Sequence, residues 1–343
     1  MKAETDARPE GLTCVLPVTL SEYLAETDPI SSWRHCPNYH TPLRLATLLR
    51  SFLRYFDSED LAEFLIIAPD IEIAAIDSII RPIVHDDPRY VILGETSLGL
   101  ELDSATKQIS NGPPGWVIQQ LLKLLAANRV RSSYYLTLDS DILCIKPVTC
   151  DRLFIDQRPI TNVERPEDYL RLYTSSIALR EYRVKQDRYL CSARCLGFDG
   201  DPNRSYFFGE TPVILRTQVV RKLLSYLDER LFPSFQSKLL SSFGWTEYGL
   251  YFQFVEKKEG IENVCALASC GDMLNLEASV WLPNKCYRNE RTYNAEHFNA
   301  AQNHSWTGPF IAIQSWLPIT SWLPHEYPSV TTFYSDLMEW LDL

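Results

Sequence analysis

The run of residues 134–138, Tyr-Tyr-Leu-Thr-Leu, constrains the fold of this chain more than any other segment. Apart from one threonine it is aromatic or aliphatic throughout, without the alternation expected of a strand that has one face in water. Continuous apolar strands are typical of parallel sheets covered by helices on both faces. The segment therefore predicts an α/β protein with a mostly parallel central sheet.

The rest of the chain alternates between strand-like and helix-like segments. Thr41 and Pro42 provide a helix N-cap and a first-turn proline, and apolar residues then recur with helical spacing. Short apolar runs predict strands at residues 13–18, 64–68, 90–93 and 213–215, and helices are expected at about 116–127 and 217–227. Because such alternation is typical of βαβ units, we expect one Rossmann-like domain over residues 1–320.

Two segments depart from this alternation. Residues 151–204 are polar, with a helix expected at 167–182, and are interpreted as a helical and loop insertion over the functional site. Near the C-terminus, Phe333, Leu337, Trp340 and Leu341 share one helical face. Residues 321–343 are therefore expected to form an amphipathic helix packed on the body, with peripheral membrane contact as the alternative.

Composition limits the classes of function. The chain has 343 residues, of which 45% are apolar and 22% charged, as in ordinary globular proteins. Its formal charge of -11 argues against nucleic-acid binding. The nine cysteines are an odd number without a Cys-x-x-Cys pair, which favours reduced thiols and a cytoplasmic location. Residues 1–11 lack an apolar stretch and no long apolar run follows, so neither an export signal nor a transmembrane segment is expected.

Asp139 and Asp141 follow the apolar run of residues 134–138. Ligands of open α/β sheets bind at the carboxyl ends of the strands. No basic residue lies between Tyr134 and Ile145, so two ionised carboxylates at this place would repel each other. A hard divalent cation, Mg²⁺ or Mn²⁺, would relieve that repulsion. The alternative is a polar strand end or a helix cap.

A second pair with the same spacing, Asp199 and Asp201, has a different context. Its neighbours Gly200, Pro202 and Asn203 favour a turn, and no strand precedes it. The segment also imitates a calcium-binding loop with Glu210 at its last position, but Arg204 stands where that loop needs glycine. We interpret this pair as a surface turn.

Further polar residues come from helices and loops elsewhere in the chain. Gln119 and Lys123 lie one turn apart, off the apolar face of their helix, where they would reach a diphosphate or sugar hydroxyls. The alternative for both is a solvated helix face. Gly209 precedes a strand, where the lack of a Cβ permits close approach of substrate or of backbone.

Thr246 and Glu247 are expected to start a helix, as N-cap and first-turn residue. Trp245 and Tyr248 beside them form an aromatic setting that suits carbohydrate, although a first-turn glutamate also simply complements the helix dipole. Farther along, His304 would complete a metal shell or contact phosphate. His297 is a second candidate for that role, and an ordinary loop histidine is the alternative for both.

Taken in order, these pieces resemble the GT-A fold of nucleotide-sugar-dependent glycosyltransferases. The shared features are a strand followed by Asp-x-Asp, a glycine-containing loop, an acidic residue at a helix start and a late histidine. A poorly characterised bacterial group of GT-A-like proteins, labelled as a domain of unknown function, is also similar in Gly115-Trp116, Gln119-Gln120, Lys123, Thr211-Pro212 and Trp245-Thr246-Glu247-Tyr248. The resemblance extends over about residues 13–315.

The resemblance implies roles for individual residues. The metal and diphosphate would be bound by Asp139, Asp141 and His304, the nucleotide sugar by Thr19, Gln119, Lys123 and Gly209, and the acceptor by Trp245, Tyr248 and Thr211. Glu247 would face the acceptor and is the candidate catalytic base. In inverting members the acidic pair is commonly Glu-Asp, whereas here Tyr248 follows Glu247, so inversion and retention both stay open.

The function expected from this resemblance is metal-dependent transfer of a sugar from a nucleotide-sugar donor, with UDP-sugar as the expected donor. The acceptor would be a glycan, a lipid-linked molecule or another hydroxyl compound, as in surface polysaccharide synthesis. A nucleotidyltransferase or phosphohydrolase would use the same carboxylates, but it predicts a phosphate-cradling Gly-rich motif that the sequence lacks. A non-catalytic carbohydrate-binding protein is the third alternative, favoured by an aromatic content of 12%.

Overall fold

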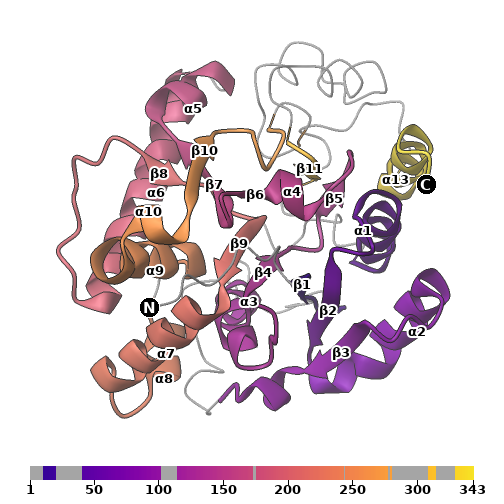
Figure 1. Cartoon of the computed structure of the whole chain (residues 1–343), viewed down its shortest axis with the longest axis horizontal. Helices are drawn as coiled ribbons and strands as arrows, with labels where there is room; N and C mark the ends of the chain where they lie inside the picture. Colours follow the sequence, from indigo (N-terminus) through magenta and orange to yellow (C-terminus); the bar gives the residue numbers. More distant parts are fainter. Residues whose placement is uncertain are drawn as a thin grey trace.

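The computed structural model describes residues 11–20, 41–101, 114–172, 175–242, 244–276, 279, 308–313 and 329–343. Within these residues a five-stranded sheet forms the centre of the molecule (Figure 1). Its strands, in spatial order, are β3 (Tyr90–Gly94), β2 (Leu61–Ala68), β1 (Leu12–Pro17), β4 (Tyr134–Thr137) and β9 (Val213–Arg216). The first four run parallel and β9 is antiparallel to β4. The expected α/β class with a mostly parallel sheet is confirmed.

The strand order places a switch point in the middle of the sheet. From β1 the chain proceeds outward to β2 and β3, and it then returns to the other side of β1 with β4. In open α/β sheets the crevice beyond the carboxyl ends of the strands at such a reversal is the usual ligand site. Thr19 after β1 and Asp139 after β4 both lie at this edge.

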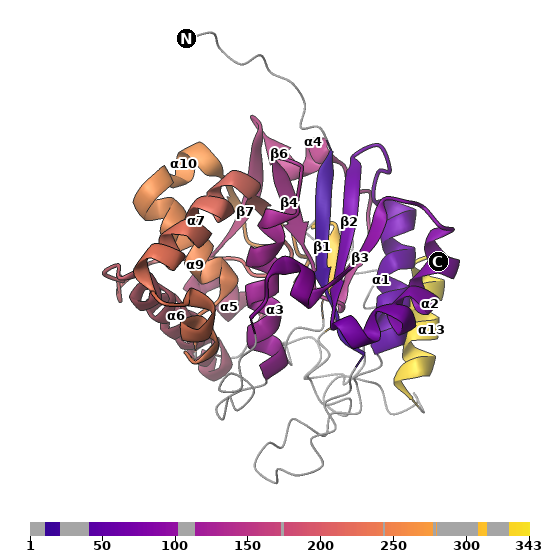
Figure 2. The same cartoon turned by 90° about the horizontal axis from the view of Figure 1, so that it is seen from below.

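Eleven helices are described, and most cover the two faces of the central sheet (Figure 2). Their bounds are α1 (Thr41–Tyr55), α2 (Ile73–Val84), α3 (Pro114–Leu125), α4 (Cys150–Leu153), α5 (Pro166–Leu172), α6 (Ser175–Leu196), α7 (Thr217–Arg230), α8 (Phe235–Leu240), α9 (Glu247–Phe254), α10 (Ile261–Val264) and α13 (Val330–Trp340). Among the described segments, no helix is long and apolar enough to cross a membrane.

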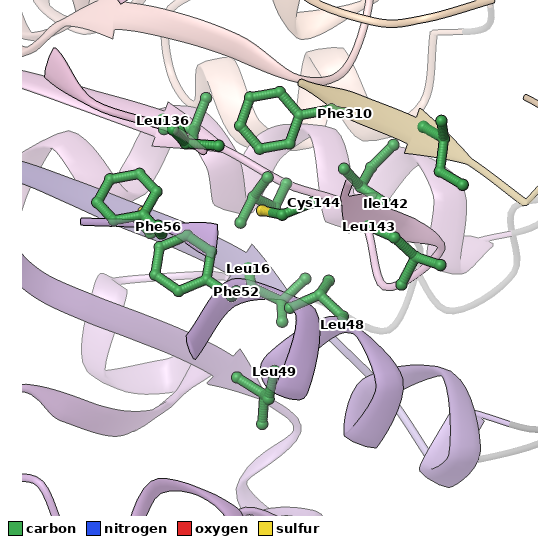
Figure 3. Close-up of a cluster of buried hydrophobic side chains, with 14 of the residues drawn as sticks. Leu16, Leu48, Leu49, Phe52, Phe56, Leu136, Ile142, Leu143, Cys144 and Phe310 are labelled. Carbon is green, nitrogen blue, oxygen red and sulfur yellow. The ribbon is translucent and has the colours of Figure 1, made fainter. Parts of the chain in front are cut away.

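Alternate residues of the buried strands belong to two separate apolar cores, one on each face of the sheet. In β1, Cys14 and Leu16 face the core formed with α1, α2 and α13, whereas Val15 faces the core formed with α3, α7 and α9. In the first core, Phe52 of α1 stacks on Phe56 at 4.3 Å between ring centroids (Figure 3). Both faces of the strands are therefore buried, which explains why the sequence of β4 lacks polar alternation.

The segment expected to be a helical insertion is instead partly β-structure. Residues 151–204 contain α5 and α6, but also β6 (Phe154–Ile155) and the seven-residue strand β7 (Arg158–Glu164). β7 pairs with β6, with β8 (Phe207–Phe208) and with β10 (Ala266–Ser269), and so it organises a second sheet. The expected helix at 167–182 corresponds to α5 and the first part of α6. Helix α6 then continues to Leu196.

The C-terminal helix α13 packs against α1 through its apolar face. Phe333, Leu337 and Leu341 are buried, and the hydroxyl of Tyr55 in α1 donates to the carbonyl oxygen of Leu341 at 2.9 Å. Close to α1 lies a two-stranded sheet of β5 (Ile142–Cys144) and β11 (Phe310–Ala312). β5 follows Asp141 directly, so α1 flanks the turn that carries the two aspartates.

Candidate active site

The two aspartates that follow β4 differ in exposure. The side chain of Asp139 is 29% exposed, whereas Asp141 is 8% exposed as a whole residue. The backbone carbonyl of Asp141 accepts a hydrogen bond from Ile313 N at 2.8 Å, which ties the turn to the end of β11. Since β4 is an inner strand of the sheet, Asp139 lies over the middle of its carboxyl edge and is the more open of the two carboxylates.

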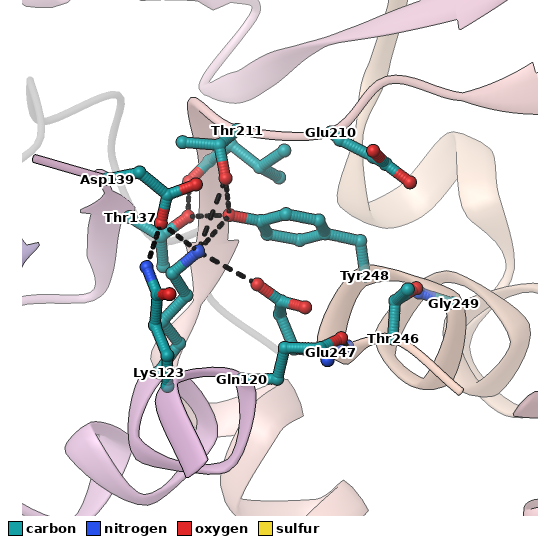
Figure 4. A network of polar contacts seen from close by, with 12 residues as sticks. Gln120, Lys123, Thr137, Asp139, Glu210, Thr211, Thr246, Glu247, Tyr248 and Gly249 are labelled. Carbon is teal, nitrogen blue, oxygen red and sulfur yellow. Dashed lines mark hydrogen bonds and ion pairs between the residues drawn. The ribbon is translucent and has the colours of Figure 1, made fainter. Parts of the chain in front are cut away.

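A lysine from α3 balances the charge of Asp139. Lys123 Nζ lies 2.7 Å from Asp139 Oδ1 and 2.9 Å from Glu247 Oε1 (Figure 4). Gln119, one turn earlier in α3, also donates to Asp139 Oδ1. No basic residue lies near the two aspartates in the sequence, and the cation that pairs with Asp139 comes from a separate segment, α3. Lys123 is 2% exposed, so it does not belong to a solvated helix face.

A tyrosine connects this ion pair to the neighbouring strands. The hydroxyl of Tyr248 lies 2.9 Å from Thr137 Oγ1, 2.7 Å from Thr211 Oγ1 and 3.3 Å from Lys123 Nζ. Lys123 Nζ also donates to Thr211 Oγ1 at 3.2 Å and lies 5.3 Å from the centroid of the Tyr248 ring. The ammonium group is thus held from several directions, which fixes its position between the two carboxylates (Figure 4).

The start of α9 positions Glu247. Thr246 is the N-cap, with its side chain accepting from Gly249 N at 2.9 Å, as its sequence position suggested. Glu247 N donates to Gln120 Oε1 at 3.3 Å. Glycine is required at position 249 because an added Cβ would lie 2.3 Å from Ser192 Oγ of α6. Close packing of α9 on α6 therefore brings Glu247 into the site, where it is 3% exposed.

The shared burial of these charges moves their pKa values. Burial raises the pKa of Glu247 above its ordinary value, although Lys123 opposes the shift. For Lys123, burial acts to lower the pKa, but the carboxylates of Asp139 and Glu247 prevail and hold it well above its ordinary value. Lys123 is therefore a cation at neutral pH. A buried cation between two carboxylates leaves the network with one surplus negative charge when both carboxylates are ionised.

A second charged cluster, which the sequence analysis missed, adjoins this network. Arg188 of α6 contacts Glu210 Oε1 at 3.1 Å, and Lys185 contacts Glu164 Oε2 of β7 at 2.6 Å. The guanidinium of Arg188 lies 5.4 Å from the centroid of the Trp116 ring. The only signal in the sequence was the i, i+3 spacing of the two basic residues in a polar helix. Glu210 belongs to this cluster and not to a calcium loop.

Several candidates have structural surroundings that favour a packing role. Trp245 is 1% exposed and its indole nitrogen donates to Leu239 O at 2.8 Å, which favours packing over the expected acceptor contact. Thr211 is 3% exposed and contacts the network through Tyr248 and Lys123. At Gly209 an added Cβ would lie 2.9 Å from Asn162 Cβ, so the neighbouring strand β7 accounts for this glycine.

Thr19 is separate from the Lys123 network. Its hydroxyl donates to Glu72 Oε2 at 3.0 Å, and Leu20 N donates to the same oxygen at 2.6 Å. Burial raises the pKa of nearby Glu95 to about 7, with further contributions from Asp70 and Glu72. These carboxylates follow β2 and β3, so they form a second acidic part of the same sheet edge.

The carboxylates that follow β4 provide some, but not all, of the ligands that a divalent cation needs. Among the described residues, no group of three or more His, Cys, Asp and Glu side chains is arranged to hold a metal ion. Asp139 and Asp141 are two carboxylates at a strand end, and Mg²⁺ is commonly held by one or two protein carboxylates together with substrate phosphates and water. The pair fits that mode of binding. His304 and His297, the expected further ligands, lie outside the described residues.

The turn at Asp199 and Asp201 has the geometry expected of it. Both residues are exposed, and Asp201 Oδ1 accepts from Asn203 N at 2.8 Å, as in an Asx turn. The contrast with Asp139 lies in what precedes each pair. A buried strand delivers Asp139 to the sheet edge, whereas α6 and a surface turn precede Asp199.

The sequence matches the model of a protein family described as a family of unknown function, DUF6492, over residues 11–337. The chain belongs to this family. A comparison with curated protein sequences finds no match.

Three solved structures illustrate what the fold is similar to. Mouse xyloside xylosyltransferase 1, in its apo form, aligns with a TM-score of 0.46 and 13% identity over 89% of this chain and 98% of that one. The galactosyltransferase LgtC in complex with donor and acceptor sugar analogs gives 0.48 and 12%, over 96% and 95%. The apo structure of the bifunctional glycosyltransferase WbbM gives 0.45 and 11%, over 99% and 50%. These are distant likenesses, with identities of 11–13%.

Proposed function

We propose that the protein is a glycosyltransferase that moves a sugar from a nucleotide-sugar donor to a hydroxyl acceptor. The observation that carries this proposal is the position of Lys123, buried between Asp139 and Glu247 at the carboxyl edge of the sheet. A sugar offers several hydroxyl groups, each a donor and an acceptor, and such groups are recognised by fixed carboxylates, amides and ammonium groups. This network presents all three within one site.

Gln120 supports a polar ligand at this place. Its Oε1 accepts from Glu247 N, while its Nε2 is buried and has no hydrogen-bond partner among the described residues. A buried amide N–H without a partner costs on the order of 1–3 kcal/mol. A donor-sugar hydroxyl beside Glu247 would satisfy it. Gln120 is therefore added to the residues that contact the sugar.

The nucleotide would lie over the ends of β1, β2 and β3. Glu72, fixed by Thr19 and by Leu20 N, offers a carboxylate suited to ribose hydroxyls. From there the diphosphate would extend to Asp139 and Asp141. These two residues would hold Mg²⁺ or Mn²⁺, which when bound stabilises the charge of the departing diphosphate. UDP is the nucleotide that we propose.

Glu247 has a positioning role in this proposal. It is 3% exposed and fixed to Lys123 at 2.9 Å, so it orients the ammonium group and binds a donor hydroxyl. An acceptor hydroxyl approaching from solvent would meet Asp139 first, because that carboxylate is more open. With Glu247 held in the ion pair, the leaving phosphate would take the acceptor's proton, and the sugar's configuration would be retained. NMR of the anomeric proton tests this; an inverted product would identify Glu247 as a base.

The proposal also covers the sugar acceptor and the cell compartment in which the reaction takes place. We propose a glycan or a lipid-linked acceptor, approached over α6, where Arg188 and Trp116 lie beside the site. The seven cysteines among the described residues are free thiols. Free thiols suit the reducing cytoplasm, which we propose as the place of the reaction.

A thermal-shift panel of nucleotide sugars, with and without Mn²⁺, tests the function. We expect one donor to raise the melting temperature in a Mn²⁺-dependent manner and Asp141→Ala to remove that dependence. Purified wild-type protein should also release the free nucleotide slowly from the same donor. If no nucleotide sugar shifts the melting temperature under either condition, the glycosyltransferase proposal is wrong.

A further inference from the structure

A buried arginine at the start of α1 has donors that remain unused. Arg44 is 4% exposed, and its Nη2 donates to Thr41 Oγ1 at 3.3 Å. Its Nε and Nη1 are also buried, and neither has a hydrogen-bond partner among the residues that the structure describes. Buried charged donors are nearly always paired, because leaving them unpaired is costly. Arg44 therefore indicates a place where an anion binds.

The position of Arg44 follows from the way that α1 lies along β5. Cys144 N donates to Ser51 Oγ at 3.1 Å, and Val148 N donates to Tyr55 O at 2.8 Å, so the helix and the chain of β5 run in the same direction. Arg44 lies seven residues before Ser51 in the helix, a distance of about 10 Å along the helix axis. Asp141 lies three residues before Cys144 in the extended chain, which is also about 10 Å. Arg44 is therefore expected at the level of Asp141.

The surroundings of Tyr334 agree with this placement. Burial raises the pKa of the Tyr334 hydroxyl, Arg44 acts to lower it, and Asp141 acts to raise it. Both charges therefore lie close enough to affect the same hydroxyl group. The register of α1 along β5 thus places Arg44 near the turn that carries the two aspartates, at the edge where the proposed diphosphate lies.

The helix itself adds to the attraction for an anion. α1 has fifteen residues and begins at Thr41, and the first backbone N–H groups of a helix have no partner within it. These groups and the helix dipole favour negative charge. The hydrogen bond to Thr41 Oγ1 keeps the guanidinium of Arg44 at this same end. A planar guanidinium beside the N–H groups of a helix start suits the oxygens of a phosphate.

We propose that Arg44 and the N-terminus of α1 form a phosphate-binding subsite beside Asp141, which holds the donor's diphosphate. The identity of the ligand rests on the proposed function, but binding of the anion does not. Arg44 and Lys123 approach the turn of Asp139 and Asp141 from opposite faces of the sheet, since α1 packs in one core and α3 in the other. The diphosphate would therefore be held from both faces.

Calorimetric titration with inorganic pyrophosphate, at one fixed Mg²⁺ concentration, tests the subsite. We expect Arg44→Met to weaken binding about tenfold or more, and Arg44→Lys to retain part of it because the charge remains without the planar fork. Arg50→Met is the matched control, since Arg50 is an exposed arginine of the same helix, and it should bind as the wild type does. Binding by Arg44→Met within twofold of the wild type would overturn the proposal.

Thermal unfolding without added anion separates a binding role from a structural one. Arg44→Met removes a buried, poorly paired charge, so its melting temperature should equal or exceed that of the wild type. A lower melting temperature together with unchanged pyrophosphate binding would make Arg44 a structural residue. If Arg44→Met does not fold, Arg44→Lys provides the same test, because a structural role would leave its affinity unchanged.

Two further ligands identify the source of the phosphate. We expect the wild type to bind UDP more tightly than farnesyl diphosphate, a lipid diphosphate, and Arg44→Met to weaken the binding of UDP; tighter, Arg44-dependent binding of farnesyl diphosphate would overturn the donor assignment. Arg44-dependent pyrophosphate binding without binding of any nucleotide sugar would refute the proposed function alone. Binding of a nucleotide sugar with no effect of Arg44→Met would refute the subsite alone.

Discussion

Two lysines in neighbouring clusters, buried Lys123 and largely buried Lys185, form similar ion pairs whose carboxylate partners differ in exposure. Lys185 is paired with Glu164, whose side chain is 13% exposed and also accepts from the hydroxyl of Tyr169. Lys123 is paired with Asp139, whose side chain is 29% exposed, and with buried Glu247. The first pair is enclosed by protein groups. The second has a carboxylate that faces the sheet edge, where the proposed nucleotide-sugar donor would reach it.

The largest effect is expected from Lys123→Met. This change leaves Asp139 and Glu247 without their cation, and breaking a buried pair in this way costs about 3–5 kcal/mol. Urea denaturation should show a loss of this size, and binding of the nucleotide sugar should be lost as well. The double variant Lys123→Met with Glu247→Gln should recover part of the stability but none of the binding. Recovery of both would mean that Lys123 has only a structural role.

Lys185→Met is the corresponding change in the enclosed cluster. It should cost about 2–4 kcal/mol of stability, because the largely enclosed carboxylate of Glu164 loses its cation. At a temperature where the variant is folded, however, it should bind the nucleotide sugar within about twofold of the wild type. Calorimetric titration of both variants measures the difference. A similar loss of binding in the two lysine variants would remove the distinction between the clusters.

This distinction could not be made from the sequence, although much of the fold could. The apolar runs of β1, β2 and β4 are continuous because both faces are buried, so local composition was sufficient to predict them. β7 was missed, because its polar residues Thr161 and Asn162 interrupt the apolar pattern. Its pairing with β8 and β10 depends on segments far away in the chain.

The candidate site shows the same limit of local reasoning. Asp139 and Lys123 were both selected, each from the element that carries it. Their ion pair could not be foreseen, because it depends on how α3 packs beside β4 and α9. The same packing buries Trp245, which as a sequence feature suggested contact with sugar. Burial and long-range pairing are properties of the folded chain, and the pattern of a single segment does not contain them.

Tyr248→Phe should have an intermediate effect. The change removes a hydroxyl that lies within 3.3 Å of Thr137, Thr211 and Lys123, and loss of such buried contacts costs about 1–3 kcal/mol. Because the hydroxyl helps to position Lys123, the affinity for the donor should fall more than in Tyr169→Phe, the matched change in the enclosed cluster. Equal donor affinities in these two variants would contradict a positioning role for Tyr248.

The smallest effect is expected at Glu95, which has carboxylates, not a lysine, as its charged neighbours. Its pKa in the folded protein is raised to about 7 from 4.5, so the folded state favours the protonated form. The stability that this provides is fully present below pH 4.5 and is lost as the pH rises through 7. Glu95→Gln cannot ionise and should keep that stability. Because Glu95 is partly exposed, solvent screening should limit the difference in stability between the two proteins to about 1 kcal/mol.

Urea denaturation of both proteins between pH 4.5 and 8 measures this difference. We expect the free energy of unfolding of the variant to exceed that of the wild type increasingly as the pH rises, and a pH-independent difference would show that the raised pKa is not a property of the folded site.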